Sequence, residues 1–171
     1  MKHHNETQIL ALDVRHSRIG YALFSGSKRL LDWGICTVPS RCNDRIEWMR
    51  GRATAILRNC SPATIVVKQQ RTLRLSRNCT GEPILNTILT AAEKRGIPVH
   101  FLGRDEIHAA FRVFMVRTKD DIACVLVRIF PELLIRLPPK RKKWQSEPHR
   151  MILFDAIATG FAYRHRFPSR E

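Results

Sequence analysis

The sequence predicts an α/β fold in which a mixed five-stranded sheet carries helices on both faces. Three apolar runs joined by short turns open the chain, as expected for an antiparallel meander. Helix-spaced apolar positions then alternate with apolar runs, which is typical of parallel strands connected by helices. The 171 residues, 44% of them hydrophobic, are enough for one domain with its own core. We find no repeat or low-complexity linker and expect a single domain over residues 1–171.

The opening meander is predicted from residues 8–14, 19–25 and 28–38, with a turn at Ser25–Lys28. The first of these strands is apolar on both alternating faces, so we expect cover on both sides of the sheet there. The third shows only weak alternation, which favours a position at the outside of the sheet.

Helices and strands alternate through the rest of the chain. Capping residues and prolines mark several ends: Asn43 or Asp44 before the first helix, Ser61-Pro62 after it, a capping box at Thr118 and a stop at Pro131. The predicted helices cover residues 43–60, 82–95, 104–112, 118–130 and 146–164, and the predicted strands cover 63–67 and 98–102.

The charge balance points to a polyanionic partner. Lys and Arg number 30 against 15 Asp and Glu, a formal net charge of +15. Nucleic acid is the simplest partner for such an excess, and an anionic membrane surface is the alternative. No apolar stretch is long enough to span a bilayer, and Met1–Glu6 has no secretory signature. The five cysteines contain no Cys-x-x-Cys pair, so we expect reduced thiols, no zinc site and a cytoplasmic location.

Two basic segments are candidate nucleic-acid contacts. Lys and Arg beside an aromatic residue suit phosphate contact combined with stacking on a base, although solvated charge runs have the same composition. The candidates are Arg71, Arg74 and Arg77 in one segment and Lys140, Arg141, Lys142, Lys143 and Trp144 in the other.

One carboxylate lies within the first predicted strand. Asp13 sits in the run Ile9–Val14, where a buried charge needs hydrogen bonds, a cation or a raised pKa. No basic residue alternates with it within residues 8–14, so we expect its partner to come from elsewhere in the fold. The alternative is an Asp that caps the turn at residues 15–18.

A second carboxylate, Asp155, lies on the last predicted helix without a cation three or four positions away. It is either exposed on a narrow polar stripe or directed at a specific partner. Small residues on the same helix favour a close approach to the sheet: Ala156, Ala158, Thr159, Gly160 and Ala162.

These two carboxylates carry a family resemblance. Residues 13–22 resemble the first motif of the RuvC-type Holliday-junction resolvases and their YqgF-type ribonuclease relatives, with Asp13 ending a strand and Gly20 opening the next. Residues 154–158 resemble the closing motif, a helix whose Asp faces the first one. The resemblance implies an RNase H-like fold and Mg²⁺ or Mn²⁺ held by Asp13 and Asp155 as catalytic residues. It also implies that the protein cleaves branched or structured nucleic acid, which is DNA for the resolvases. The related resolvases are dimers, so a homodimer is one expected assembly.

The sequence departs from the family pattern at the remaining ligands. Lys68 stands where the family has a Glu, Arg15 replaces a Gly, and Ile152 replaces a further ligand. Glu147 and His149 are expected to line the site only if the last helix starts differently, and Asp105 or Glu106 are more remote substitutes. Arg15 is expected to contact nucleic acid. Two functions remain open on this fold: a metal-dependent endonuclease, or a catalytically impaired nucleic-acid-binding protein in which Lys68 replaces the metal. A partner-binding module whose charge serves solubility is a third interpretation.

Overall fold

A computed structural model describes residues 8–26, 29–70, 82–140, 142 and 144–167. Residues Met1–Glu6 and part of the predicted turn at Ser25–Lys28 therefore lie outside the described part of the chain.

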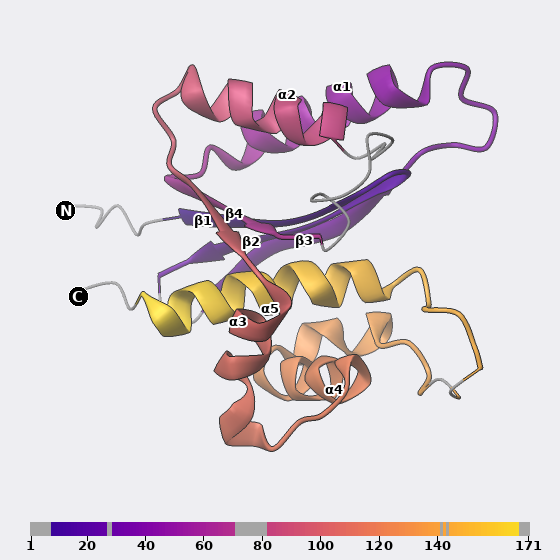
Figure 1. Cartoon of the computed structure of the whole chain (residues 1–171), viewed down its shortest axis with the longest axis vertical. Helices are drawn as coiled ribbons and strands as arrows, with labels where there is room; N and C mark the ends of the chain where they lie inside the picture. Colours follow the sequence, from indigo (N-terminus) through magenta and orange to yellow (C-terminus); the bar gives the residue numbers. More distant parts are fainter. Residues whose placement is uncertain (1–7, 27–28, 71–81, 141, 143, 168–171) are drawn as a thin grey trace.

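The five predicted strands form one mixed sheet with the order β3-β2-β1-β4-β5 (Figure 1). Strands β1 (Gln8–Arg15), β2 (Arg18–Ser25) and β3 (Arg29–Thr37) are antiparallel, whereas β4 (Thr64–Lys68) and β5 (Val99–Leu102) run parallel to β1. The predicted meander, the parallel extension and the outer position of β3 are confirmed. The central position of β1 means that its side chains point into cores on both faces.

Helices cover the two faces of this sheet (Figure 1). Helices α1 (Arg45–Cys60) and α2 (Glu82–Glu93) lie on one face. On the other face, α5 (Met151–Arg166) packs on the strands, and α3 (Arg104–Ala110) and α4 (Lys119–Ile129) pack on α5. No helix in the described ranges is long and apolar enough to cross a membrane.

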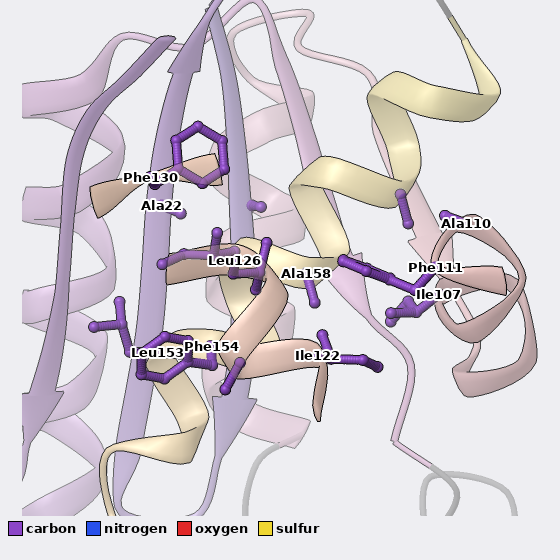
Figure 2. Close-up of a cluster of buried hydrophobic side chains, with 14 of the residues drawn as sticks. Ala22, Ile107, Ala110, Phe111, Ile122, Leu126, Phe130, Leu153, Phe154 and Ala158 are labelled. Atoms are coloured by element: carbon purple, nitrogen blue, oxygen red, sulfur yellow. The ribbon is translucent and has the colours of Figure 1, made fainter. Parts of the chain in front are cut away.

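Two hydrophobic clusters fill the space between sheet and helices. Leu10 and Leu12 of β1 face the α1/α2 side, and Ile9 and Ala11 face the α5 side. This alternation places apolar residues on both faces of a central strand. Figure 2 shows the α5-side cluster, in which side chains of α3, α4 and α5 meet the sheet. The prediction that the first strand is covered on both sides is confirmed.

Local signals explain several helix ends. The Asp44 side chain accepts a hydrogen bond from the Glu47 N–H at 2.9 Å, and Thr118 forms the predicted capping box with Asp121. Pro131 ends α4 as predicted, but it also opens a 3₁₀ helix, η3 (Pro131–Arg136), because proline is well suited to a first helical position. A second 3₁₀ helix, η2 (Arg112–Phe114), follows α3.

Two glycines let α5 approach the sheet closely. A Cβ added at Gly20 of β2 would lie 2.4 Å from the Ile152 carbonyl oxygen, and one added at Gly160 would lie 2.2 Å from Cε2 of Phe24. Any side chain at either position would force the helix away from the sheet. The close approach predicted from the small residues of the last helix is confirmed, and it brings Asp155 over the end of β1.

Candidate active site

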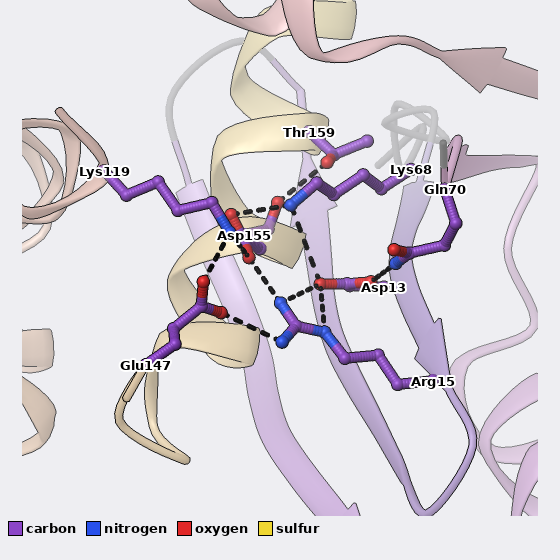
Figure 3. Close-up of polar contacts among 8 residues, drawn as sticks. All are labelled: Asp13, Arg15, Lys68, Gln70, Lys119, Glu147, Asp155 and Thr159. Carbon is purple, nitrogen blue, oxygen red and sulfur yellow. Dashed lines mark hydrogen bonds and ion pairs between the residues drawn. The ribbon is translucent and has the colours of Figure 1, made fainter. Parts of the chain in front are cut away.

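The two predicted carboxylates meet at the junction of β1, β4 and α5 (Figure 3). Asp13 is completely buried and the Asp155 side chain is 10% exposed. One nitrogen, Arg15 Nη2, lies 3.0 Å from Asp13 Oδ2 and 2.6 Å from Asp155 Oδ2. Asp155 is therefore directed at a specific site, and the exposed alternative is excluded.

Arg15 connects all three carboxylates of the cluster. Its Nε and Nη2 donate to Asp13, its Nη2 also donates to Asp155, and its Nη1 donates to Glu147 Oε1 at 2.9 Å. The expectation that Asp13 finds its partner away from its own strand is confirmed for Lys68 and Gln70, but it is wrong for Arg15, which lies on β1 itself. Strand β1 extends to residue 15, and side chains two residues apart lie on the same face of a strand. Asp13 is also paired with Gly20 within the β1–β2 ladder, so it does not cap the following turn.

Lys68 lies between the two aspartates. Its Nζ is 2.8 Å from Asp155 Oδ1 and 3.8 Å from Asp13 Oδ2, at the end of β4. This residue thus occupies the place predicted from its position in the sequence, and its ammonium group faces the two carboxylates.

Two further donors complete the cluster. Lys119 Nζ lies 2.9 Å from Glu147 Oε2 and 3.0 Å from Asp155 Oδ2, and Gln70 Nε2 donates to Asp13 Oδ1. Every carboxylate oxygen of Asp13, Glu147 and Asp155 is therefore paired with at least one amide, ammonium or guanidinium nitrogen. Three carboxylates and three cationic side chains balance one another in this cluster, which we call the charge cluster.

The pKa shifts follow from burial and pairing. Burial raises the pKa of Asp13; Lys68 opposes this shift, whereas the Asp155 charge adds to it. Burial alone would also raise the pKa of Glu147, but hydrogen bonds and charge from Lys119 and Arg15 lower it to about 2. For Lys119, burial lowers the pKa, and the stronger combined effect of Asp155 and Glu147 raises it. Glu147 and Lys119 are therefore ionised together at neutral pH.

Glu147 reaches the cluster because α5 begins later than predicted. The helix starts at Met151, not at residue 146, and Glu147 lies in the preceding non-helical segment. There it bonds to Arg15 and Lys119 together. His149 lies in the same segment but is exposed, and Ile152 is a buried apolar residue that has no group able to bind a metal. Glu106 lies outside the cluster and accepts bonds from Arg166 and the Gly103 N–H.

Sequence reasoning missed Lys119 and Gln70. Gln70 follows β4 in a polar run, and that position was a weak signal for a place at the end of the sheet. Lys119 is the first residue of α4, directly after the Thr118 cap, and nothing in its local sequence indicates a buried partner.

The charge cluster does not fit a divalent cation. Mg²⁺ is bound by oxygen ligands, carboxylate oxygens among them, that converge on one point in near-octahedral geometry. Here those oxygens are directed at Arg15, Lys68 and Lys119. Within the described ranges, no group of three or more His, Cys, Asp or Glu residues is arranged to hold a metal ion.

The predicted basic segments are described only in part. Lys140, Lys142 and Trp144 are exposed, and Lys142 Nζ lies 5.4 Å from the centroid of the Trp144 ring. Arg71, Arg74, Arg77, Arg141 and Lys143 lie outside the described residues.

The fold of this chain is similar to that of known proteins, although its sequence is not. No protein-family model and no curated protein matches the sequence. Among solved structures, Thermus thermophilus RuvC in complex with a Holliday junction substrate is similar, with 19% identity, 95% of this chain and 97% of that chain covered, and a TM-score of 0.69.

Two further solved structures agree with this likeness. For the yeast mitochondrial Holliday junction resolvase Ydc2, identity is 12%, coverage is 92% of this chain and 77% of that one, and the TM-score is 0.59. For the fowlpox virus resolvase with Holliday junction DNA, identity is 13%, coverage is 93% of this chain and 99% of that one, and the TM-score is 0.54. The chain therefore has the RuvC-like, RNase H-like fold of the Holliday junction resolvases.

Proposed function

We propose that this protein binds branched DNA of the Holliday-junction type, and that its own cations take the place of divalent metal ions between the carboxylates. One observation carries the proposal: each oxygen of Asp13, Glu147 and Asp155 is paired with a donor from the same chain. A protein of this kind recognises the shape and charge of DNA without hydrolysing it.

Charge and fold together support DNA as the ligand. The chain carries a formal net charge of +15, which favours phosphate contact. Exposed Lys140, Lys142 and Trp144 combine cations with an aromatic ring, as single-stranded DNA contacts do. Thermus thermophilus RuvC and the fowlpox virus resolvase, which share the fold, have both been solved with Holliday junction DNA. Branched DNA is the ligand class consistent with all three observations.

Electrostatics supports the loss of metal binding. A divalent ion between Asp13 and Asp155 would lie against the Lys68 ammonium group, which is already 2.8 Å from Asp155 Oδ1. Two like unit charges 4 Å apart repel by about 4 kcal/mol near a protein surface, and a divalent ion doubles that cost. Arg15, which pairs with the same two carboxylates, adds to the repulsion.

A metal-dependent endonuclease is the second candidate. The meeting of Asp13 and Asp155 at the end of the sheet favours it, because two carboxylates from distant segments are what a metal-dependent phosphodiesterase needs. That function requires Arg15 and Lys68 to leave the carboxylates when DNA and metal bind.

The two candidates are separated by binding and cleavage measured on the same substrates. We expect the protein to bind a four-way junction in EDTA at least as tightly as in Mg²⁺ or Mn²⁺, to lose affinity steeply with salt, and to leave every strand intact on a denaturing gel. A salt slope near zero contradicts phosphate contact.

Asp13→Asn is the matched control for cleavage. Metal-dependent cleavage that disappears in this variant contradicts our proposal and establishes the endonuclease. Cleavage of equal rate in the variant comes from a contaminating nuclease.

A further inference from the structure

Three consecutive apolar residues project from the surface between α3 and α4. Val113, Phe114 and Met115 are 72%, 42% and 89% exposed. Val113 and Phe114 are the last two residues of η2 and Met115 follows it, on the side of α3 and α4 that faces away from the sheet (Figure 1). A run of three consecutive exposed apolar residues is unfavourable on a protein surface unless it serves a function such as binding. We call Val113–Met115 the apolar tip.

The apolar tip is held in a fixed conformation. The Phe114 ring packs against Phe111 and Phe161, with centroids 6.2 Å and 6.5 Å apart, and Phe111 is fully buried. The Met115 N–H donates to the Arg112 carbonyl at 2.9 Å, and Met115 adopts a left-handed φ of 53°. Non-glycine residues rarely adopt that conformation, so the surrounding contacts determine it. Phe114 thus anchors the turn, while Val113 and Met115 project from it.

Two exposed arginines flank the apolar tip in the sequence. Arg112 and Arg117 are both exposed, one at each end of it. Lys119, which belongs to the charge cluster, is four residues beyond Met115, so the two Cα atoms are at most about 14 Å apart. An apolar projection between two arginines is complementary to DNA, in which the apolar faces of a base step lie between two negatively charged phosphates. The three residues of the apolar tip are far fewer than the roughly 20 that each side of a stable protein interface supplies, which favours DNA over a second protein as the ligand.

We propose that the apolar tip inserts Val113 and Met115 against unstacked bases at the branch point of DNA, while Arg112 and Arg117 contact the neighbouring phosphates. Architectural DNA-binding proteins use apolar wedges in this way to hold a kinked duplex open. The branch point is where the cost of unstacking is smallest, because base stacking is already interrupted there. This inference rests on the proposed function, since it requires that the protein bind branched DNA.

The test is a four-way junction carrying 2-aminopurine next to the branch point, a base analogue whose fluorescence rises when it is unstacked. We compare the full chain with Val113→Ser/Met115→Ser and keep Phe114, whose ring packs inside the protein. The matched control is Leu134→Ser/Ile135→Ser, which removes another largely exposed apolar pair, 63% and 79% exposed, from η3. Circular dichroism and thermal unfolding check that both variants are folded.

We expect the wild type and the η3 control to raise the fluorescence, and the tip variant to lose most of that rise. We also expect the tip variant to bind the junction about tenfold more weakly, with less than about a twofold change on linear duplex. Unchanged fluorescence and affinity in the tip variant overturn the wedge and leave junction binding intact. An equal loss in the η3 control also overturns it, because the effect then comes from surface apolarity in general.

Two other results separate this inference from the proposed function. Failure of the wild-type protein to bind the junction overturns both. A tip variant that keeps its junction affinity but no longer floats with anionic phospholipid vesicles identifies the apolar tip as a membrane contact, and the wedge is then wrong.

Discussion

The charge cluster and the apolar tip both reverse the usual distribution of residues between interior and surface. In the charge cluster, Asp13 is completely buried, whereas in the apolar tip Met115 is 89% exposed. The groups of the charge cluster have found their partners within the chain, on β1, β4, α4, α5 and the segment before α5. The first region is therefore already paired in the free protein, whereas the second, in our proposal, gains its partner only when DNA binds.

A difference in stability is the first consequence. Buried charges depend on their counter-charges, because an uncompensated buried charge costs several kcal/mol. Shortening an exposed apolar side chain removes few contacts, so the free energy of unfolding changes little. We therefore expect substitutions in the charge cluster to act mainly on folding, and substitutions in the apolar tip to act mainly on binding.

The largest expected effect comes from Asp155→Ala. This change leaves Lys68, Arg15 and Lys119 without their shared carboxylate, at a site where the Lys68 and Asp155 side chains are only 11% and 10% exposed. We expect the free energy of unfolding to fall by about 3–5 kcal/mol, measured by urea denaturation.

Glu47→Ala is the matched control, because it breaks an exposed Arg50–Glu47 pair with a distance of 3.8 Å. Such surface pairs contribute less than about 1 kcal/mol. Equal effects of the two substitutions would show that the charge cluster is no more important for folding than a surface ion pair.

A smaller effect is expected from acid titration of Glu147. Its folded pKa, about 2, lies below its ordinary value of 4.5, so the unfolded chain takes up the proton first. The stability that Glu147 contributes is therefore present above pH 4.5 and lost as the pH falls toward 2. Glu147→Gln should reduce the loss of unfolding free energy over this range, as measured by urea denaturation at each pH. Parallel curves for variant and wild type would contradict the pairing with Lys119 and Arg15.

The smallest effect on folding is expected in the apolar tip. Val113→Ser/Met115→Ser should change the free energy of unfolding by no more than about 0.5 kcal/mol per substitution, because both side chains are exposed. Thermal unfolding measures this directly. A loss as large as that of Asp155→Ala would mean that the apolar tip packs within the protein and is not available to a ligand.

Much of the fold followed from local patterns in the sequence. The meander and the parallel strands follow from the order of apolar runs and helix-spaced positions, the outer position of β3 follows from its weak alternation, and the caps at Asp44 and Thr118 are short-range signals. The proximity of Asp13 and Asp155 follows from the family resemblance, since no local signal connects the two ends of the chain.

The rest of the charge cluster depends on tertiary contacts that local patterns do not encode. Arg15 was missed as the partner of Asp13 because the strand was predicted to end one residue earlier. The run Ser146-Glu147-Pro148 predicts a helix start that includes Glu147, whereas this residue lies in the non-helical segment before α5, where it bonds to Arg15 and Lys119. Lys119 reaches its partners through a long side chain whose target the sequence does not specify.

Calorimetric titration with Mn²⁺ tests most directly whether the cations of the charge cluster replace a divalent ion. Arg15→Gly/Lys68→Glu removes two positive charges and adds one negative charge beside Asp13 and Asp155. We predict no saturable Mn²⁺ binding by the wild type at millimolar concentration, and binding at least about tenfold tighter by the double variant. Equal Mn²⁺ affinity in the two proteins, or tight binding by the wild type, would contradict the account.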